Sequence, residues 1–129
     1  MNYIVTESSQ NISPIGWHIS AKQEFYNLQN FLGGMYVAGG KLKETGTAHW
    51  NANNVGATNE TGFTALPGGE LKSWDPVYDL LGFKGWFWSS SPGIDGGSHF
   101  YLALTSGSES VLRSDDPFGS SYSVRCIRD

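Results

Sequence analysis

Glycine divides this chain into short apolar stretches, and that division is the strongest constraint on its fold. Seventeen glycines are spread over 129 residues, 14% of the residues are aromatic and only 16% are charged. Glycine reaches backbone conformations that other residues avoid, and short aromatic or β-branched runs between turns are typical of strands. This composition belongs to a folded domain and not to a disordered segment. We therefore predict one domain, residues 1–129, in which helix is the minority.

One stretch departs from the pattern and predicts an α-helix. Its apolar residues recur at the three- and four-residue spacing that places side chains on one helical face. These residues are Phe25, Leu28, Phe31 and Leu32. Ser20 is expected to cap the N-terminus, with Gln23 three residues later completing a capping box. Gly33-Gly34 supplies the expected stop.

The next segment predicts a short helix followed by a long loop. The helix is expected over Met35–Ala38 and should end at Gly39-Gly40. Lys41–Asn59 is rich in Gly, Thr, Asn and Ala, with Trp50 embedded in it. Such a composition indicates an ordered loop that is held by burying its aromatic residue.

Strands are expected between turn clusters in the rest of the chain. They are Tyr3–Val5, Ile12–Ile19, Phe63–Leu66, Trp86–Ser90, Phe100–Leu104, Val111–Arg113 and Tyr122–Ile127. Side chains alternate between the two faces of a strand. The last of these strands should therefore turn Tyr122, Val124 and Cys126 inward and Ser123 and Arg125 outward.

The same alternation divides the strand at residues 99–105 into two faces. Phe100, Leu102 and Leu104 share one face, and the odd-numbered residues from His99 through Tyr101 to Thr105 share the other. Early helices followed by a glycine-rich meander predict an α+β fold, with helices on one side of an antiparallel sheet.

The charge balance argues against two classes of partner. The formal net charge is −4, and the cations are scattered, whereas nucleic-acid binding needs clustered cations. No nucleic-acid partner is expected. No apolar run reaches the about 20 residues that span a bilayer, so no membrane insertion is expected. Residues 1–10 lack the regions of a signal peptide. Either export does not use that route or the sequence begins after the signal.

Five strings in a fixed order resemble a known family. They are Gly16–Ser20, Ala38–Gly46, Gly56–Gly69, Phe87–Ser90 and Ser123–Asp129. Together they resemble the Fibrobacter succinogenes major paralogous domain, a family abundant in Bacteroidetes, over residues 12–129. The resemblance implies a C-type-lectin-like α+β fold, with one or two N-terminal helices packed on an antiparallel sheet with long irregular loops. It also implies display outside the cell, at a cell or virion surface, but no reaction.

The sequence departs from that family in two places. Members often carry a cysteine before the Gly-Trp motif, apparently paired with the one in Val-Arg-Cys, but this chain has Ser13-Pro14-Ile15 there. The resemblance then implies that Cys126 is a buried free thiol that acts as a small hydrophobe. The N-terminal strand region of longer members is missing or shortened, so the chain is expected to be a fragment or a compact variant.

The last third of the chain has an unusual composition. The types Trp, Gln, Met, Lys and Glu occur 20 times in residues 1–88, so about nine are expected in residues 89–129, yet only Glu109 is found. Asparagine is also absent after Asn59. A diversity-generating retroelement would produce this bias, because it rewrites AAC codons in the last segment of C-type-lectin-like targets, and a rewritten AAC codon never yields those five types. The alternative is a Ser-, Gly- and Asp-rich set of loops that avoids them by chance.

Both readings place a recognition surface in the same region, where aromatic and adaptable polar side chains are combined as in antibody loops. The expected ligand-binding residues are Asp95, His99, Tyr101, Leu112, Asp115, Asp116 and Phe118, with Trp74 and Tyr78 at the rim. The expected partner is a protein or glycan receptor on a cell surface, and an oligomer is left open. The alternatives are a structural cell-envelope domain without a dedicated ligand and, less favoured, a carbohydrate-binding lectin.

No enzyme chemistry, metal or cofactor is expected. His18, His49 and His99 lack metal-binding spacing. The aspartates at 95, 115 and 116 could offer oxygens to calcium, but the sugar-binding triplets of C-type lectins are absent and calcium needs six to eight converging oxygens. The related formylglycine-generating enzymes need a cysteine pair, which one cysteine cannot supply. The framework residues Trp17, Trp50, Trp86 and Trp88 are expected in the core.

Overall fold

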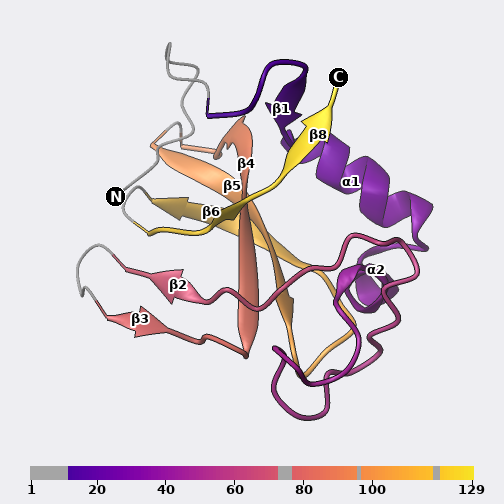
Figure 1. Ribbon diagram of the computed structural model, residues 1–129. Helices are drawn as coiled ribbons and strands as arrows, with labels where there is room; N and C mark the ends of the chain where they lie inside the picture. Colours follow the sequence, from indigo (N-terminus) through magenta and orange to yellow (C-terminus); the bar gives the residue numbers. More distant parts are fainter. Residues whose placement is uncertain (1–11, 73–76, 96, 118–119) are drawn as a thin grey trace.

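A computed structural model describes residues 12–72, 77–95, 97–117 and 120–129 (Figure 1). The elements, in chain order, are β1 (Trp17–Ile19), α1 (Lys22–Phe31), α2 (Met35–Leu42), β2 (Glu70–Leu71), β3 (Tyr78–Asp79), β4 (Lys84–Pro92), β5 (Ser98–Thr105), β6 (Leu112–Pro117), β7 (Ser123–Val124) and β8 (Cys126–Arg128). Two early helices and predominantly antiparallel strands confirm the α+β class. The expected strand at Tyr3–Val5 lies outside the described residues.

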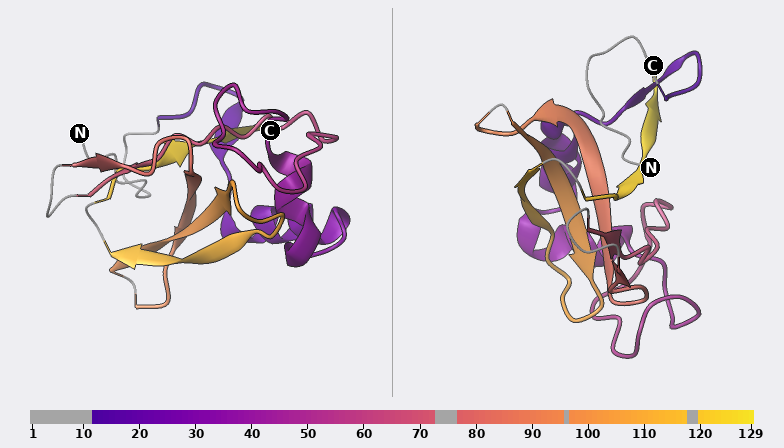
Figure 2. Two further views of the ribbon diagram at one scale, coloured as in Figure 1. Left: turned by 90° about the horizontal axis from the view of Figure 1, so that it is seen from below. Right: turned by 90° about the vertical axis from the view of Figure 1, so that its left-hand side faces the viewer.

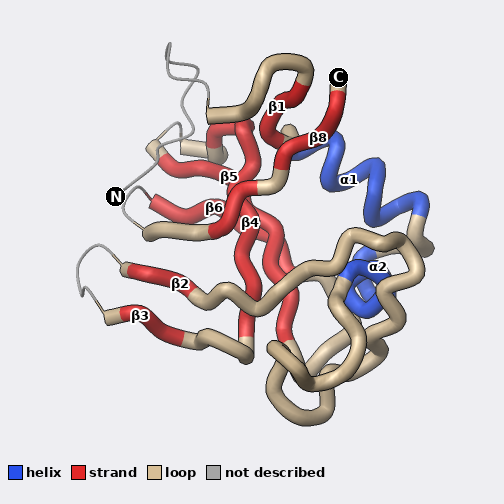
Figure 3. The backbone as a smooth tube through the Cα atoms, in the orientation of Figure 1, coloured by secondary structure: helices blue, strands red, loops and turns tan. Residues whose placement is uncertain are grey.

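The central sheet has four strands in the order β6-β5-β4-β7. Figure 3 labels β4, β5 and β6 of this sheet near the centre of the molecule. Strands β4, β5 and β6 form an antiparallel meander, whereas β7 runs parallel to β4. Two short ribbons lie beside this sheet. One pairs β1 with β8 and so joins the two ends of the described chain, and the other pairs β2 with β3.

The core lies between the sheet and the two helices, which pack on one face of it (Figure 2). Phe100, Leu102 and Leu104 of β5 are all buried on that face, as their alternation predicted. The Tyr26 ring of α1 meets the Phe100 ring edge to face, with 5.6 Å between ring centroids. No described helix is long and apolar enough to cross a membrane.

Helix α1 begins one residue later than predicted and turns one predicted core residue outward. Ala21, not Ser20, is its N-cap, and the carboxylate of Glu24, not Gln23, accepts the Ala21 N–H at 3.0 Å. Phe31 was expected on the buried face but is 88% exposed. At 3.6 residues per turn it lies about 120° around the helix from Phe25, too far to share the face of Phe25 and Leu32. The stop at Gly33-Gly34 is confirmed, and both glycines have positive φ.

Helix α2 runs through the glycine pair that was expected to end it. Gly39 and Gly40 are buried in the middle of the helix because other backbone segments touch them. A Cβ at Gly39 would lie 2.5 Å from the Ser110 carbonyl oxygen, and one at Gly40 would collide with the Gly56 carbonyl. The glycines therefore permit close packing, which outweighs their low helix propensity.

The long loop is ordered in the expected way but begins at Lys43 and not at Lys41. Trp50 is 1% exposed, and its Nε1 donates to the Ala65 carbonyl at 2.9 Å. The expected strand Phe63–Leu66 is reduced to a single parallel bridge between Lys43 and Ala65. Isolated pairing of this kind closes the loop onto the end of α2.

The last predicted strand is interrupted at Arg125, which separates β7 from β8. Its guanidinium lies 4.2 Å from the Phe63 ring centroid and donates to the Phe63 carbonyl at 2.7 Å. Arg125 was expected to point outward and is instead half-buried, because its stem and its charge both find partners there. Cys126 is also half-buried and not fully buried.

Two further boundary predictions need correction. Of the expected strand Ile12–Ile19, only Trp17–Ile19 pairs, and Val111–Arg113 is replaced by a strand over Leu112–Pro117.

Trp50, Trp86 and Trp88 are buried as expected. Trp17 is not, because β1 belongs to a two-stranded ribbon outside the main core, where it is 43% exposed.

Candidate functional site

Strand register gathers aromatic residues of β4 and β5 on the sheet face that points away from the helices. Directly opposed residues in antiparallel strands share a face of the sheet. Between β5 and β6, the opposed pairs on this face are His99 with Asp116, Tyr101 with Ser114, and Ala103 with Leu112. Strand β4 adds Trp88 opposite Tyr101 and Trp86 opposite Ala103. We call this the aromatic face; its members are Trp86, Trp88, His99, Tyr101, Ala103, Leu112, Ser114, Asp116 and the ring of Tyr122 that packs on it.

Two tryptophans form the floor of the aromatic face. Trp86 and Trp88 are 6% and 7% exposed, and Tyr122 covers both. Its ring is parallel to Trp86 within 7° at 5.4 Å and lies 4.4 Å from Trp88. Tyr101 meets Tyr122 edge on at 5.6 Å. Contacts of this kind stabilise aromatic pairs beyond their buried area and limit side-chain motion.

The upper layer of the face is half-buried and polar at its edges. The Tyr122 hydroxyl donates to Asp116 Oδ2 at 2.6 Å, and burial together with this bond raises the pKa of Tyr122 far above its ordinary value. Burial also raises the pKa of Tyr101, and the Asp116 carboxylate adds to that effect. Both phenols therefore stay neutral at physiological pH and present rigid rings with polar ends.

Four of the expected ligand-binding residues lie together on this face: His99, Tyr101, Leu112 and Asp116. Leu112 is 42% exposed, and the other three are half-buried. Partly accessible side chains on regular strands, above a packed aromatic floor, form a preorganised contact surface.

The remaining expected residues lie elsewhere. Asp115 alternates to the opposite face, opposite Phe100, and accepts the Ile94 N–H at 3.0 Å. Asp95 lies in the turn between β4 and β5, where its Oδ1 accepts bonds from the Ser98 hydroxyl at 2.7 Å and from two backbone N–H groups. These hydrogen bonds, that of Ser98 first, lower the pKa of Asp95. Trp74 and Phe118 lie outside the described residues.

Sequence reasoning missed three members of the face or gave them another role. Trp86 and Trp88 were assigned only to the core, and Tyr122 only to an inward strand position. The pairing of β4 with both β5 and β7 brings the three together. The alternation of β4 could have placed the tryptophans on one face, but no local signal identified the neighbouring strands.

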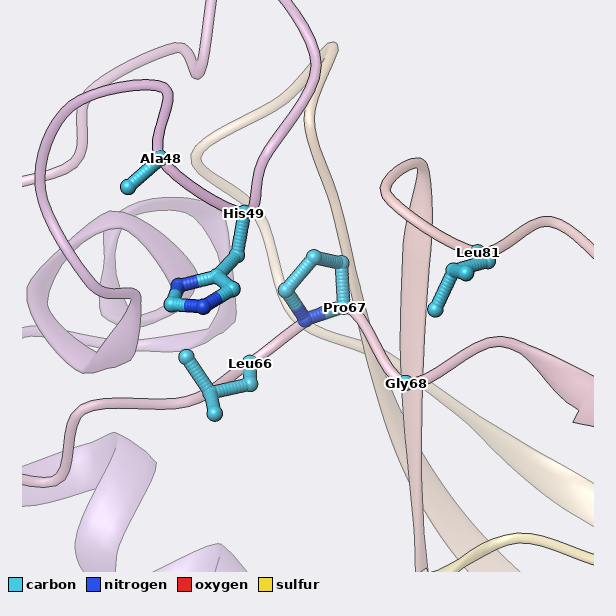
Figure 4. A pocket seen from close by; sticks show the side chains of 6 residues that line it. All are labelled: Ala48, His49, Leu66, Pro67, Gly68 and Leu81. Atoms are coloured by element: carbon cyan, nitrogen blue, oxygen red, sulfur yellow. The ribbon is translucent and has the colours of Figure 1, made fainter.

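A separate pocket of about 380 Å³ lies beside the long loop (Figure 4). Its walls are the apolar side chains of Ala48, Leu66, Pro67 and Leu81, with the imidazole of His49 among them. The Oε2 atom of Glu44 lies 2.9 Å from His49 Nδ1, within hydrogen-bond distance. Tyr78, expected at the rim of the recognition surface, is 56% exposed, and its hydroxyl donates to the carbonyl of Gly68, which lines this pocket.

Within the described ranges, no group of three or more His, Cys, Asp and Glu side chains is arranged to hold a metal ion. Each of the three histidines has its own protein partner or ring contact. His18 bridges Glu24 and Asp129 at 2.8 Å and 2.7 Å, and His99 meets Trp88 edge on at 6.2 Å.

Comparison with known proteins gives one match. The family described as the Fibrobacter succinogenes major domain matches residues 2–128, nearly the whole chain. No match was found among curated proteins or among solved structures.

Proposed function

The chain belongs to the Fibrobacter succinogenes major domain family, and from that premise we propose that it is a non-enzymatic binding module whose aromatic face recognises a protein or glycan receptor on a cell surface. The observation that carries the proposal is the gathering of His99, Tyr101, Leu112 and Asp116 on one face of a regular sheet. All four come from the segment that almost lacks Trp, Gln, Met, Lys and Glu. The floor beneath them comes from β4, just before that segment.

This division suits a surface whose contacts can change while its support does not. Trp86 and Trp88 are buried and fixed by ring contacts, whereas Leu112 and Ser114 are exposed on a strand whose backbone is fully paired with β5. Substitution at such positions alters the contact surface at little cost in stability. We include in the proposal that the segment is a target of a diversity-generating retroelement, on a phage receptor-binding protein or a bacterial adhesin.

The proposal also includes the finer fold class and the location. Two helices on one face of an antiparallel sheet, together with a long ordered loop, support a C-type-lectin-like fold. Such a module would act outside the cell, at a bacterial or virion surface, alone or as an oligomer. A fold by itself does not imply a ligand, so the recognition claim depends on the aromatic face.

A matched pair of variants tests the binding surface. Leu112→Arg places a bulky cation on the edge strand of the aromatic face, and Phe31→Arg places the same side chain on α1, on the helical side of the sheet. Both original side chains are exposed, at 42% and 88%, so each variant should stay within about 0.5 kcal/mol of wild-type stability. Wild-type protein and both variants are screened against immobilised glycans and bacterial surface proteins.

The expected result is a set of ligands that wild type and Phe31→Arg share and that Leu112→Arg loses by a factor of about ten or more, equivalent to about 1.4 kcal/mol. Equal binding by both variants would place recognition elsewhere. The absence of any ligand for the wild-type protein would favour the alternative, a structural cell-envelope domain without a dedicated ligand.

DNA sequencing around the gene tests the retroelement part independently. A reverse transcriptase gene and a near-copy of the region that encodes residues 89–129 are expected nearby. If neither is present, the surface belongs to a fixed member of the family with a single ligand, and the compositional bias arose by chance.

A further inference from the structure

A second pocket, which shares no residue with the aromatic face, opens between α1 and the β1–β8 ribbon. Its volume is about 380 Å³, near the lower end of the range of about 300–1,000 Å³ for small-molecule sites. The two elements lie side by side at the edge of the molecule in Figure 1. The pocket exists because β1 and β8 pair with each other and not with the central sheet, which leaves a gap over α1.

The walls of this pocket are mostly apolar. Phe25 of α1 is 3% exposed at its base, and Leu28 and Phe63 are partly buried against the core. Trp17 and Ile127, on the two strands of the ribbon, are 43% and 36% exposed. Large apolar side chains that remain exposed around a concave site favour an apolar ligand group.

Two arginines give the pocket a positive mouth. The chain has a net charge of −4 and three arginines, and two of the three, Arg125 and Arg128, line this pocket. Among the described residues, neither forms a salt bridge. The guanidinium of Arg125 is fixed by the Phe63 carbonyl and ring, while Arg128 is exposed on β8, directly opposite Trp17.

The carboxylates near the mouth are already engaged. Glu24 also lines the pocket, but it accepts the Ala21 N–H at 3.0 Å and lies 2.8 Å from His18 Nε2. Asp129 lies 2.7 Å from the other ring nitrogen of His18. The two acids therefore bind one histidine, and neither forms a salt bridge with Arg125 or Arg128.

We propose that this pocket binds a small amphipathic carboxylate, with its aliphatic or aromatic body against Phe25 and Leu28 and its carboxylate at Arg125 and Arg128. A planar guanidinium matches a carboxylate in geometry and forms stronger hydrogen bonds to it than to a neutral group. This site is independent of the recognition function proposed for the aromatic face.

The single cysteine of the chain provides a direct reporter. Cys126 is a free thiol, half-buried, and lines this pocket. Because the chain has one cysteine, alkylation by iodoacetamide, followed by intact mass, measures access to the site without any substitution. Octanoate, octanol and octyltrimethylammonium share one apolar body and differ in charge, so their protection of Cys126 can be compared directly.

Octanoate is expected to slow the alkylation of Cys126 in a saturable manner. The octanoate concentration that gives half-maximal protection should be at least about tenfold lower than that of octanol, a difference equivalent to about 1.4 kcal/mol in binding free energy. Octyltrimethylammonium should protect least. Arg128→Gln should remove most of the difference between octanoate and octanol, and Arg128→Lys should restore part of it. Lys41→Gln, which removes a partly exposed cation from α2, is the matched control and should leave octanoate protection unchanged.

Two results would overturn the proposal. Equal protection by octanoate and octanol in the wild type would show an apolar cavity without preference for an anion. Octanoate protection that Arg128→Gln does not weaken would place the anion elsewhere. The indole resonance of Trp17 in NMR spectra, assigned with Trp17→Phe, gives a second readout and should shift with the same concentration dependence as protection.

Discussion

Lys43 is the residue on which the structure makes its sharpest stability prediction. Its side chain is fully buried, and its Nζ donates to the backbone carbonyls of Val55, Thr105 and Ser108 at 2.8, 2.9 and 3.0 Å. These carbonyls belong to the long loop, to the end of β5 and to the following turn. One ammonium group therefore ties the long loop to the end of β5 and the turn that follows it, and Lys43→Met should loosen these contacts while it keeps the apolar stem.

The size of the loss follows from two opposing effects. Each buried carbonyl left without a donor costs about 1–3 kcal/mol. Burial lowers the pKa of Lys43 from 10.5 to about 8, so the buried charge itself costs about 3 kcal/mol at neutral pH, and this cost disappears with the charge. Partial access of water to the loop carbonyls reduces the first effect. We expect a net loss of about 2–4 kcal/mol in the free energy of unfolding.

The assay is urea unfolding at neutral pH, with Lys41→Met as the matched control. Lys41 lies two residues before Lys43, in the last turn of α2, but it forms only a partly exposed ion pair with Glu60 at 3.5 Å, which is worth about 0–1 kcal/mol. A loss of less than about 1 kcal/mol in Lys43→Met would refute the reasoning, because it would mean that the three carbonyls do not depend on this donor.

The pH dependence gives an independent check on the same residue. Between pH 8 and pH 10.5 the unfolded chain holds the Lys43 proton and the folded chain releases it. Folding is therefore favoured as pH rises through this window, and the cost of the buried charge is fully present only below it. Wild type should gain stability relative to Lys43→Met by at most about 3 kcal/mol across that range. A constant difference would contradict the assignment.

Gly40→Ala should destabilise the fold by about 2 kcal/mol or more, because its Cβ would collide with the Gly56 carbonyl. In contrast, Gly107→Ala, with open space around it, should change urea-unfolding stability by less than about 0.5 kcal/mol; equal losses would contradict the proposed packing. The pKa of His18 is raised, mainly by its hydrogen bond to Glu24, so its contribution is present at low pH and is lost as pH rises through the folded-state pKa. The melting-temperature difference between wild type and His18→Gln should therefore shrink from about pH 5 to about pH 9. A difference that stays constant over this range would contradict a stabilising contribution from protonated His18.

Local patterns predicted the elements whose signal lies within a few residues. The spacing that ends at Leu32 gave α1, and the alternation in β5 gave its buried face, because helical and strand periodicity are set by the backbone alone. The end of α1 at Gly33-Gly34 could also be predicted, since a positive φ favours glycine. The family motifs added the expected class of fold, and the compositional bias pointed to the last third of the chain.

The predictions for Gly39, Gly40 and Arg125 failed because they depended on partners remote in sequence. Gly39 and Gly40 were predicted to end the second helix, but they lie inside α2 and pack closely against residues 110 and 56. Arg125 was predicted to point outward, but its guanidinium binds the carbonyl and the ring of Phe63. The role of Lys43 had no local signal, because its acceptors are supplied 12, 62 and 65 residues away.

The candidate sites divide in the same way. The sequence by itself determined that His99 and Tyr101 share a face, since this needs only a strand of period two. Only the tertiary structure decided that Asp116 joins them, that Asp115 does not, and that two arginines line one pocket with residues of α1. Pairing register and the packing of ribbons are set by the whole core, and a shift of one residue would exchange the faces of a strand.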